Sequence, residues 1–128
     1  MASFYQPLDT SAREIRLVTV EAGKGDEIHC KLNTVSLDGD LPQYESVSYC
    51  WGDITKKSSI VLDGQTTVDV SKNAHAALMR IRDPNIDRTI WIDAICINQT
   101  DVEERGSQVS NMHLVYHRAT RNLIWLGE

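Results

Sequence analysis

The stretch from Thr89 to Ile97, TIWIDAICI, decides the fold class. It is almost continuously apolar and rich in β-branched and aromatic residues, which is typical of a strand buried on both faces in a parallel sheet. Asp93 interrupts the run, and a buried carboxylate needs partners because an unpaired charge is costly to bury. Two roles are open for Asp93: a hydrogen bond to nearby loop amides, or a place in a site, as a ribose contact or a charge partner for Arg105.

Downstream, the sequence predicts a helix and a further strand. Asp101 and Glu104 have the spacing of a capping box, so we expect a helix to begin at Asp101. The apolar stripe expected along this helix consists of Val109, Met112, Val115, Tyr116 and Ala119. The apolar run NLIWL at Asn122–Leu126 predicts another buried strand.

Upstream, a strand and a helix complete an alternating order. Tyr44–Tyr49 is a short β-prone run, and Ser71 is a plausible N-cap for a helix that Asp83-Pro84-Asn85 ends. The core face of that helix is expected to be Ala74, Ala77, Leu78 and Ile81. The predicted elements thus alternate along the chain between strand and helix, and this order implies right-handed crossovers and parallel strands. Ligands bind at the carboxyl ends of such strands, where Ser48–Asp53 and Asp93–Arg105 lie.

Two hairpins are expected beside this core. Arg13–Val20 and Glu27–Val35 both alternate apolar with polar residues and suit an antiparallel pair. Ser58–Val70 predicts a second hairpin, because Asp63-Gly64 is favoured in type I′ turns. The predicted fold is therefore α/β, a parallel sheet with flanking helices and added N-terminal and inserted β-hairpins, in one domain over residues 1–128.

Composition limits the function classes. The net charge of −5, with scattered Lys and Arg, gives no basic face for nucleic acid. No apolar run approaches the ~20 residues that span a bilayer, and no secretory signal is evident, so we expect a cytoplasmic protein. Three cysteines without a CxxC pair, and His113 and His117 without a third ligand, predict no disulfide framework and no metal site. Cys50 and Cys96 suit buried structural thiols better than nucleophiles.

Three runs resemble the heterokaryon incompatibility (HET) domain of fungal self/non-self recognition. They are YESVSYCWGD at Tyr44–Asp53, WIDAICINQTDVEERGSQVSNMHLVYHRA at Trp91–Ala119, and IWLG at Ile124–Gly127. The resemblance covers nearly the whole chain, and WIDAICINQ followed by D-x-x-E-R is highly specific. It implies a module that triggers programmed cell death when incompatible cells fuse, with the sensing region outside this chain.

A more distant similarity is to Toll/interleukin receptor (TIR) domains, which implies a TIR-like or flavodoxin-like sheet. Val47–Asp53 is similar to their FLSFRGED run, and the segment from Trp91 to Val109 to their FIDxxxLxxGxxI run. Several TIR domains cleave NAD, and others only self-associate. Their catalytic glutamate follows the third strand, whereas this chain stops at Glu128. The resemblance then implies a domain cut after its third core strand, either a fragment or a minimal version.

Glu104 is the catalytic candidate within the chain. A carboxylate beside a dinucleotide can stabilise an oxocarbenium-like centre or position water. The structural alternatives are a helix cap shared with Asp101 and an ion pair with Arg105. The other candidates are ligand-binding: Ser48, Tyr49, Cys50, Trp51, Gly52, Asp53, Asp93, Asn98, Gln99, Asp101 and Arg105.

Several of these candidates have a structural alternative of their own. Trp51 either stacks on a base or belongs to the core, and Gly52 allows close backbone approach or a positive φ. Asn98 and Gln99 either hold their loop or contact a ligand. Two functions follow: signalling by self-association or binding to other signalling domains, and NAD cleavage, with NAD as a nucleotide substrate rather than a cofactor.

Overall fold

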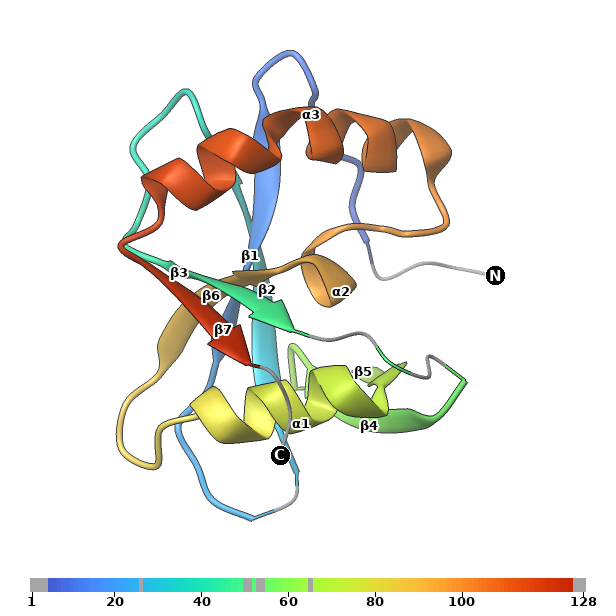
Figure 1. Cartoon of the computed structure of the whole chain (residues 1–128), viewed down its shortest axis with the longest axis vertical. Coiled ribbons are helices and arrows are strands. Elements are labelled where there is room, and N and C mark those ends of the chain that lie inside the picture. The colour runs from blue at the N-terminus through green and yellow to red at the C-terminus, as the bar shows by residue number, and fades with distance from the viewer. Residues whose placement is uncertain (1–4, 26, 50–51, 53–54, 65, 126–128) are drawn as a thin grey trace.

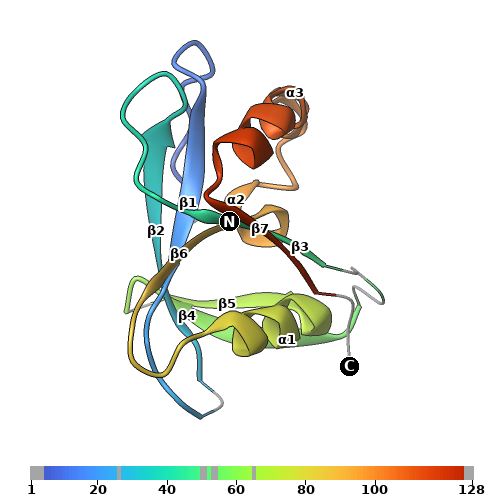
Figure 2. The same cartoon turned by 60° about the vertical axis from the view of Figure 1, so that its left-hand side comes forward.

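One mixed seven-stranded sheet organises the computed structural model, which describes residues 5–25, 27–49, 52, 55–64 and 66–125 (Figures 1 and 2). The strand order is β5-β4-β2-β1-β6-β3-β7. Strands and helices run in chain order as β1 Glu14–Val20, β2 His29–Ser36, β3 Glu45–Tyr49, β4 Lys57–Leu62, β5 Thr66–Ser71, α1 Lys72–Ile81, β6 Arg88–Ile92, α2 Asp93–Cys96, α3 Val102–Arg118 and β7 Arg121–Trp125.

Three strands form the predicted parallel core. β3 lies between β6 and β7 and runs parallel to both, so that Val47 pairs with Ile92 on one side and with Leu123 on the other. Helices α3 and α1 lie on opposite sides of β3 and β7 (Figures 1 and 2). The α/β class and the adjacency of these three strands are confirmed.

Both predicted hairpins are present, and they make the sheet mixed rather than parallel. β1 pairs antiparallel with β2 and with β6, while β4 pairs antiparallel with β5 and parallel β2–β4 pairing joins the hairpins. Asp63 and Gly64 both have positive φ, as a type I′ turn requires. The finer TIR-like or flavodoxin-like assignment stays a prediction.

Helix α1 follows its sequence pattern. The Ser71 hydroxyl accepts a hydrogen bond from the Ala74 amide at 3.1 Å, which satisfies one of the free donors of the first turn. Its buried face is the predicted one: Ala74, Ala77, Leu78 and Ile81. None of the helices in the described ranges is long and apolar enough to cross a bilayer.

The run Thr89–Ile97 is not one strand, which corrects the prediction. β6 ends at Ile92, and the next four residues form α2, with Asp93 in its first turn. The apolar run stays buried because the residues on both sides of this bend, Ile90 and Ile97 among them, pack into one core. Asp93 is consequently half-buried at a helix start rather than enclosed in a strand.

Two further burial predictions are wrong. Val109 is 57% exposed, because α3 turns Glu104, Gln108 and Val115 toward the core instead. β7 is not buried on both faces: it is the last strand of the sheet that the described residues form, and Ile124 is 72% exposed. Composition alone does not separate a central from an edge strand when both are apolar.

Candidate functional site

A groove runs between β5 and α2, close to the carboxyl ends of β3 and β6. It consists of two adjoining pockets of about 320 and 210 Å³. Both pockets are lined by Lys57, Asp69, Val70, Ala94 and Gln99. We call this hollow the α2 groove. It lies where an open α/β sheet binds ligands.

Tyr49 lines the smaller pocket of the α2 groove. Burial raises the pKa of its phenol; a hydrogen bond with the Ser71 side chain opposes this shift, and the negative charge of Asp93 adds to it. Gln99 lies in the groove wall, and its Nε2 donates to the Asp93 carbonyl oxygen at 2.9 Å. Tyr49, Asp93 and Gln99, all predicted ligand-binding residues, therefore meet at one place.

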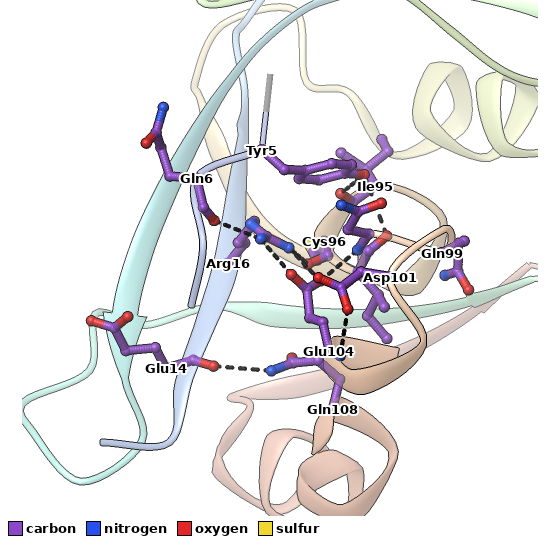
Figure 3. Close-up of polar contacts among 12 residues, drawn as sticks. Tyr5, Gln6, Glu14, Arg16, Ile95, Cys96, Gln99, Asp101, Glu104 and Gln108 are labelled. Atoms are coloured by element: carbon purple, nitrogen blue, oxygen red, sulfur yellow. Dashed lines mark hydrogen bonds and ion pairs between the residues drawn. The ribbon is translucent and has the colours of Figure 1, made fainter. Parts of the chain in front are cut away.

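A buried ion pair lies next to Tyr5, which lines the larger pocket of the groove (Figure 3). The two terminal nitrogens of Arg16 donate to the two carboxylate oxygens of Glu104, each at 2.7 Å. Arg16 is 1% exposed and Glu104 7%. The Asn98 amide donates to the same carboxylate at 2.6 Å. Such a bidentate, charge-assisted pair fixes its partners' geometry.

Arg16 also binds the segment before β1. Its Nη2 donates to the Gln6 carbonyl at 2.8 Å, its Nη1 to the Cys96 carbonyl at 3.1 Å, and its guanidinium lies 4.4 Å from the centre of the Tyr5 ring. The Tyr5 hydroxyl donates to the Ile95 carbonyl at 2.6 Å. One cation thus holds together the N-terminal segment, β1, α2 and α3 (Figure 3).

These contacts show which partner the Glu104 side chain takes. Asp101 caps α3 by accepting from the Glu104 amide at 3.1 Å, but the Glu104 side chain turns to Arg16 instead of completing a capping box. Arg105 is exposed, and its Nη1 is 3.5 Å from the Gln99 carbonyl. Glu104 therefore pairs with Arg16 rather than with Arg105. Its catalytic role stays a prediction.

Comparison with known proteins identifies the family. The profile described as "Heterokaryon incompatibility protein (HET)" matches residues 44–128. The chain belongs to the HET family. It is 32% identical over 114 residues to the Neurospora crassa protein named "Heterokaryon incompatibility protein 6, OR allele", covering 80% of this chain and 17% of that relative, so it spans less than a fifth of the relative's length. No solved structure gives a significant match.

The loop after α2 in this HET chain is held by its own side chains. Asn98 Oδ1 accepts from the Thr100 hydroxyl at 2.8 Å and from the Thr100 amide at 3.3 Å. Gln99 is tied to α2 through the Asp93 carbonyl. Asn98 and Gln99 line the groove as well, so loop architecture and ligand contact are compatible here.

The other predicted loop is described only in part. Ser48 is exposed, and Cys50, Trp51 and Asp53 lie outside the described residues. Gly52 has a φ of +57°, and an added Cβ would collide with the side-chain amide of Asn73 in α1. Its expected positive φ is confirmed. A ligand site that Ser48–Asp53 shares with Asp93–Arg105 stays a prediction.

The two described cysteines of the HET chain are buried free thiols. Burial raises the pKa of Cys30 and of Cys96 to about 12. A thiol is nucleophilic as the thiolate, so this environment favours the structural reading of Cys96. Within the described residues, no group of three or more His, Cys, Asp or Glu side chains could hold a metal.

Four residues of the site were missed in the sequence: Tyr5, Arg16, Lys57 and Asp69. Arg16 is one of the polar residues of the predicted alternating strand, but β1 is central in the sheet and buried on both faces. A charged residue between Ile15 and Leu17 was the signal for it, as its burial demands a counter-charge. Lys57 and Asp69 carry no such signal, since both are exposed hairpin residues.

Proposed function

We propose that the chain is the effector module of a fungal heterokaryon incompatibility protein. It acts in the cytoplasm, triggers programmed cell death when incompatible cells fuse, and works by self-association or by binding other signalling domains. The observation that carries this proposal is the HET family membership, together with a relative that is named for heterokaryon incompatibility.

The contacts of the Glu104 carboxylate favour a binding function of the chain over a catalytic one. Both of its carboxylate oxygens are engaged by Arg16, and one of them also accepts from the Asn98 amide. Using this carboxylate as a base or nucleophile requires breaking a buried ion pair, which leaves an uncompensated charge and costs about 3–5 kcal/mol. Glu104 suits a positioning role, in which it fixes the loop that forms one wall of the α2 groove.

Induced expression of the chain in a filamentous fungus tests this function. We expect cell death, scored by uptake of a vital dye, in cells that express the wild-type chain or the surface variant Lys31→Ala. A charge placed in the core by Leu17→Asp, at a residue 1% exposed, removes the fold and should remove the killing. Normal growth despite accumulation of folded wild-type protein contradicts the proposal.

The second candidate is an NAD-cleaving effector, and the α2 groove is the observation in its favour. The larger pocket of the groove, of about 320 Å³ and lined by residues that follow the carboxyl end of β6, falls in the size range of small-molecule sites. Lys57 and Asp69 supply exposed charges there, and Tyr49 supplies an aromatic ring. Glu104 is not among the described residues that line the groove.

Titration calorimetry with NAD tests this candidate. If the groove takes the dinucleotide, Lys57→Ala should weaken binding by about tenfold, the effect of one lost charge-assisted contact, whereas Lys31→Ala on β2 should leave it unchanged. An absence of heat of binding at high protein concentration excludes NAD as a ligand of the isolated chain.

A further inference from the structure

The Tyr5 side chain is held at the α2 groove by contacts with β1 and with the end of α2. Its hydroxyl donates to the Ile95 carbonyl oxygen at 2.6 Å, with a second carbonyl oxygen, that of Ile97, at 3.3 Å. The Arg16 guanidinium lies 4.4 Å from the centre of the ring, as in a cation–π contact (Figure 3). These surroundings recognise both the ring and the hydrogen-bond donor that it carries.

The groups that surround Tyr5 are fixed by other parts of the fold. Arg16 is held by two hydrogen bonds to the Glu104 carboxylate, and its side chain is 2% exposed. The two carbonyl groups belong to the end of α2, where a backbone hydrogen bond closes the helix. Departure of the ring is therefore expected to leave a formed subsite, and a preorganised site binds a ligand at a lower cost in entropy.

The segment that carries Tyr5 is weakly attached. Residues 5–11, which we call the N-terminal strap, form neither helix nor strand, and every one of them is at least partly exposed. Gln6 adds one hydrogen bond, in which its carbonyl oxygen accepts from Arg16 at 2.8 Å. Segments with few buried apolar contacts open locally at a low cost in free energy. We therefore expect the strap to detach while the sheet stays folded.

Tyr5 also lies on the wall of the larger pocket of the groove, of about 320 Å³. The space that its ring vacates would consequently be continuous with the groove. Burial raises the pKa of the phenol, and the nearby Cys96 thiol adds to this shift. The hydroxyl thus remains a hydrogen-bond donor throughout the physiological pH range.

We propose that Tyr5 fills a subsite of the α2 groove for an aromatic ring that carries a hydrogen-bond donor, and that a ligand with such a ring displaces the N-terminal strap. Phenols, such as a tyrosine side chain, have this chemistry, and so do amino-substituted heterocycles, such as a nucleobase. In both, the flat face stacks on Arg16 and the donor binds the carbonyls of Ile95 and Ile97. The inference goes beyond the proposed function, because it holds whether or not the chain kills cells.

Titration calorimetry with small probes tests the subsite. Tyr5→Ala removes the ring, so we expect this variant to bind p-cresol, the tyrosine side chain as a free molecule, about tenfold or more tightly than the wild type, which must first release its strap. Toluene has the same ring without the donor and should bind about fivefold more weakly than p-cresol, the effect of one lost hydrogen bond.

A second probe and a second variant sharpen the test. Binding of adenosine to Tyr5→Ala assigns the subsite to nucleobases, whereas binding of p-cresol alone assigns it to phenols; both results support the subsite. Tyr116→Ala is the matched control, because it truncates another partly buried tyrosine, which lies edge-on to Trp91 on α3. This control should show no preference for p-cresol over toluene.

Three results overturn the inference: a folded Tyr5→Ala variant that binds neither p-cresol nor adenosine, equal affinity of this variant and the wild type for p-cresol, or toluene binding as tight as that of p-cresol. If Tyr5→Ala does not fold, Tyr5→Phe takes its place. It keeps the ring on Arg16 but loses the hydroxyl, so p-cresol should displace its strap and bind about fivefold more tightly than to the wild type. An unchanged affinity overturns the inference as well.

Discussion

The ion pair between Arg16 and Glu104 is the residue-scale feature on which the site depends. Their side chains are 2% and 8% exposed, so removing either leaves a buried charge without a partner. We predict that Glu104→Ala lowers the free energy of unfolding by about 3–5 kcal/mol, measured by chemical denaturation. The neighbouring Glu103→Ala, at an exposed position, should change it by less than about 0.5 kcal/mol.

A double variant extends the denaturation experiment on the Arg16–Glu104 pair. Replacing both partners, as in Arg16→Met with Glu104→Leu, removes both charges and should recover much of the lost stability, since apolar replacements of buried pairs are often neutral or stabilising. Equal and small effects of Glu104→Ala and Glu103→Ala would show that the pair does not hold the fold.

The buried thiols give a pH dependence at the residue scale. Burial raises the pKa of Cys30 and Cys96 from 9.0 to about 12. Above pH 9.0 the unfolded thiols lose protons that the folded ones keep, so the unfolded state binds fewer protons and stability falls as pH rises. The stabilisation is fully present below pH 9.0 and is lost as pH rises toward 12.

Urea unfolding at several alkaline pH values measures this loss. Each thiol contributes a slope of up to about 1.4 kcal/mol per pH unit, and Cys96→Ala should make the decline shallower. A wild-type stability that stays flat above pH 9.0, or an unchanged slope in the variant, would place these thiols in contact with water.

At the scale of elements, Gly52, three residues after the end of β3, lies against the side chain of Asn73 in α1. Gly52 and Gly64 both have positive φ, but only Gly52 would bring an added Cβ against another side chain, that of Asn73. We predict that Gly64→Ala costs about 1 kcal/mol of strain and that Gly52→Ala costs clearly more, by thermal unfolding. Adding Asn73→Ala to Gly52→Ala removes the colliding side chain and should bring the melting temperature closer to that of Gly64→Ala. Identical melting temperatures for Gly52→Ala and Gly64→Ala would contradict this packing.

The sequence predicted most elements, because their periodicities are local. The hairpin at Asp63-Gly64, the cap at Ser71 and the parallel core all follow from neighbouring residues. The bend at Ile92 was not predictable in the same way, since the residues from Ile90 to Ile97 make one apolar run that Asp93 alone interrupts. The edge position of β7 was missed for a similar reason: burial depends on how many neighbours a strand has.

At the scale of the molecule, the site combines segments that are far apart in the chain. Arg16 and Glu104 are 88 residues apart, and Tyr5 reaches Ile95 across 90. Such pairings depend on which strands become neighbours, and local patterns carry no information about that. The sequence indicated the two loops and their shared sheet edge, whereas the counter-charge of Glu104 required the assembled fold.

Nicotinamide release from NAD by the purified chain tests most directly the claim that this module acts by binding, with Glu104 in a structural role. The wild-type chain, at high concentration and in folded form, should release no nicotinamide above the protein-free blank. Two results together would contradict the account: the wild-type chain releases nicotinamide, and Glu104→Gln abolishes this release. The variant must keep the groove unchanged and a melting temperature close to that of the wild type.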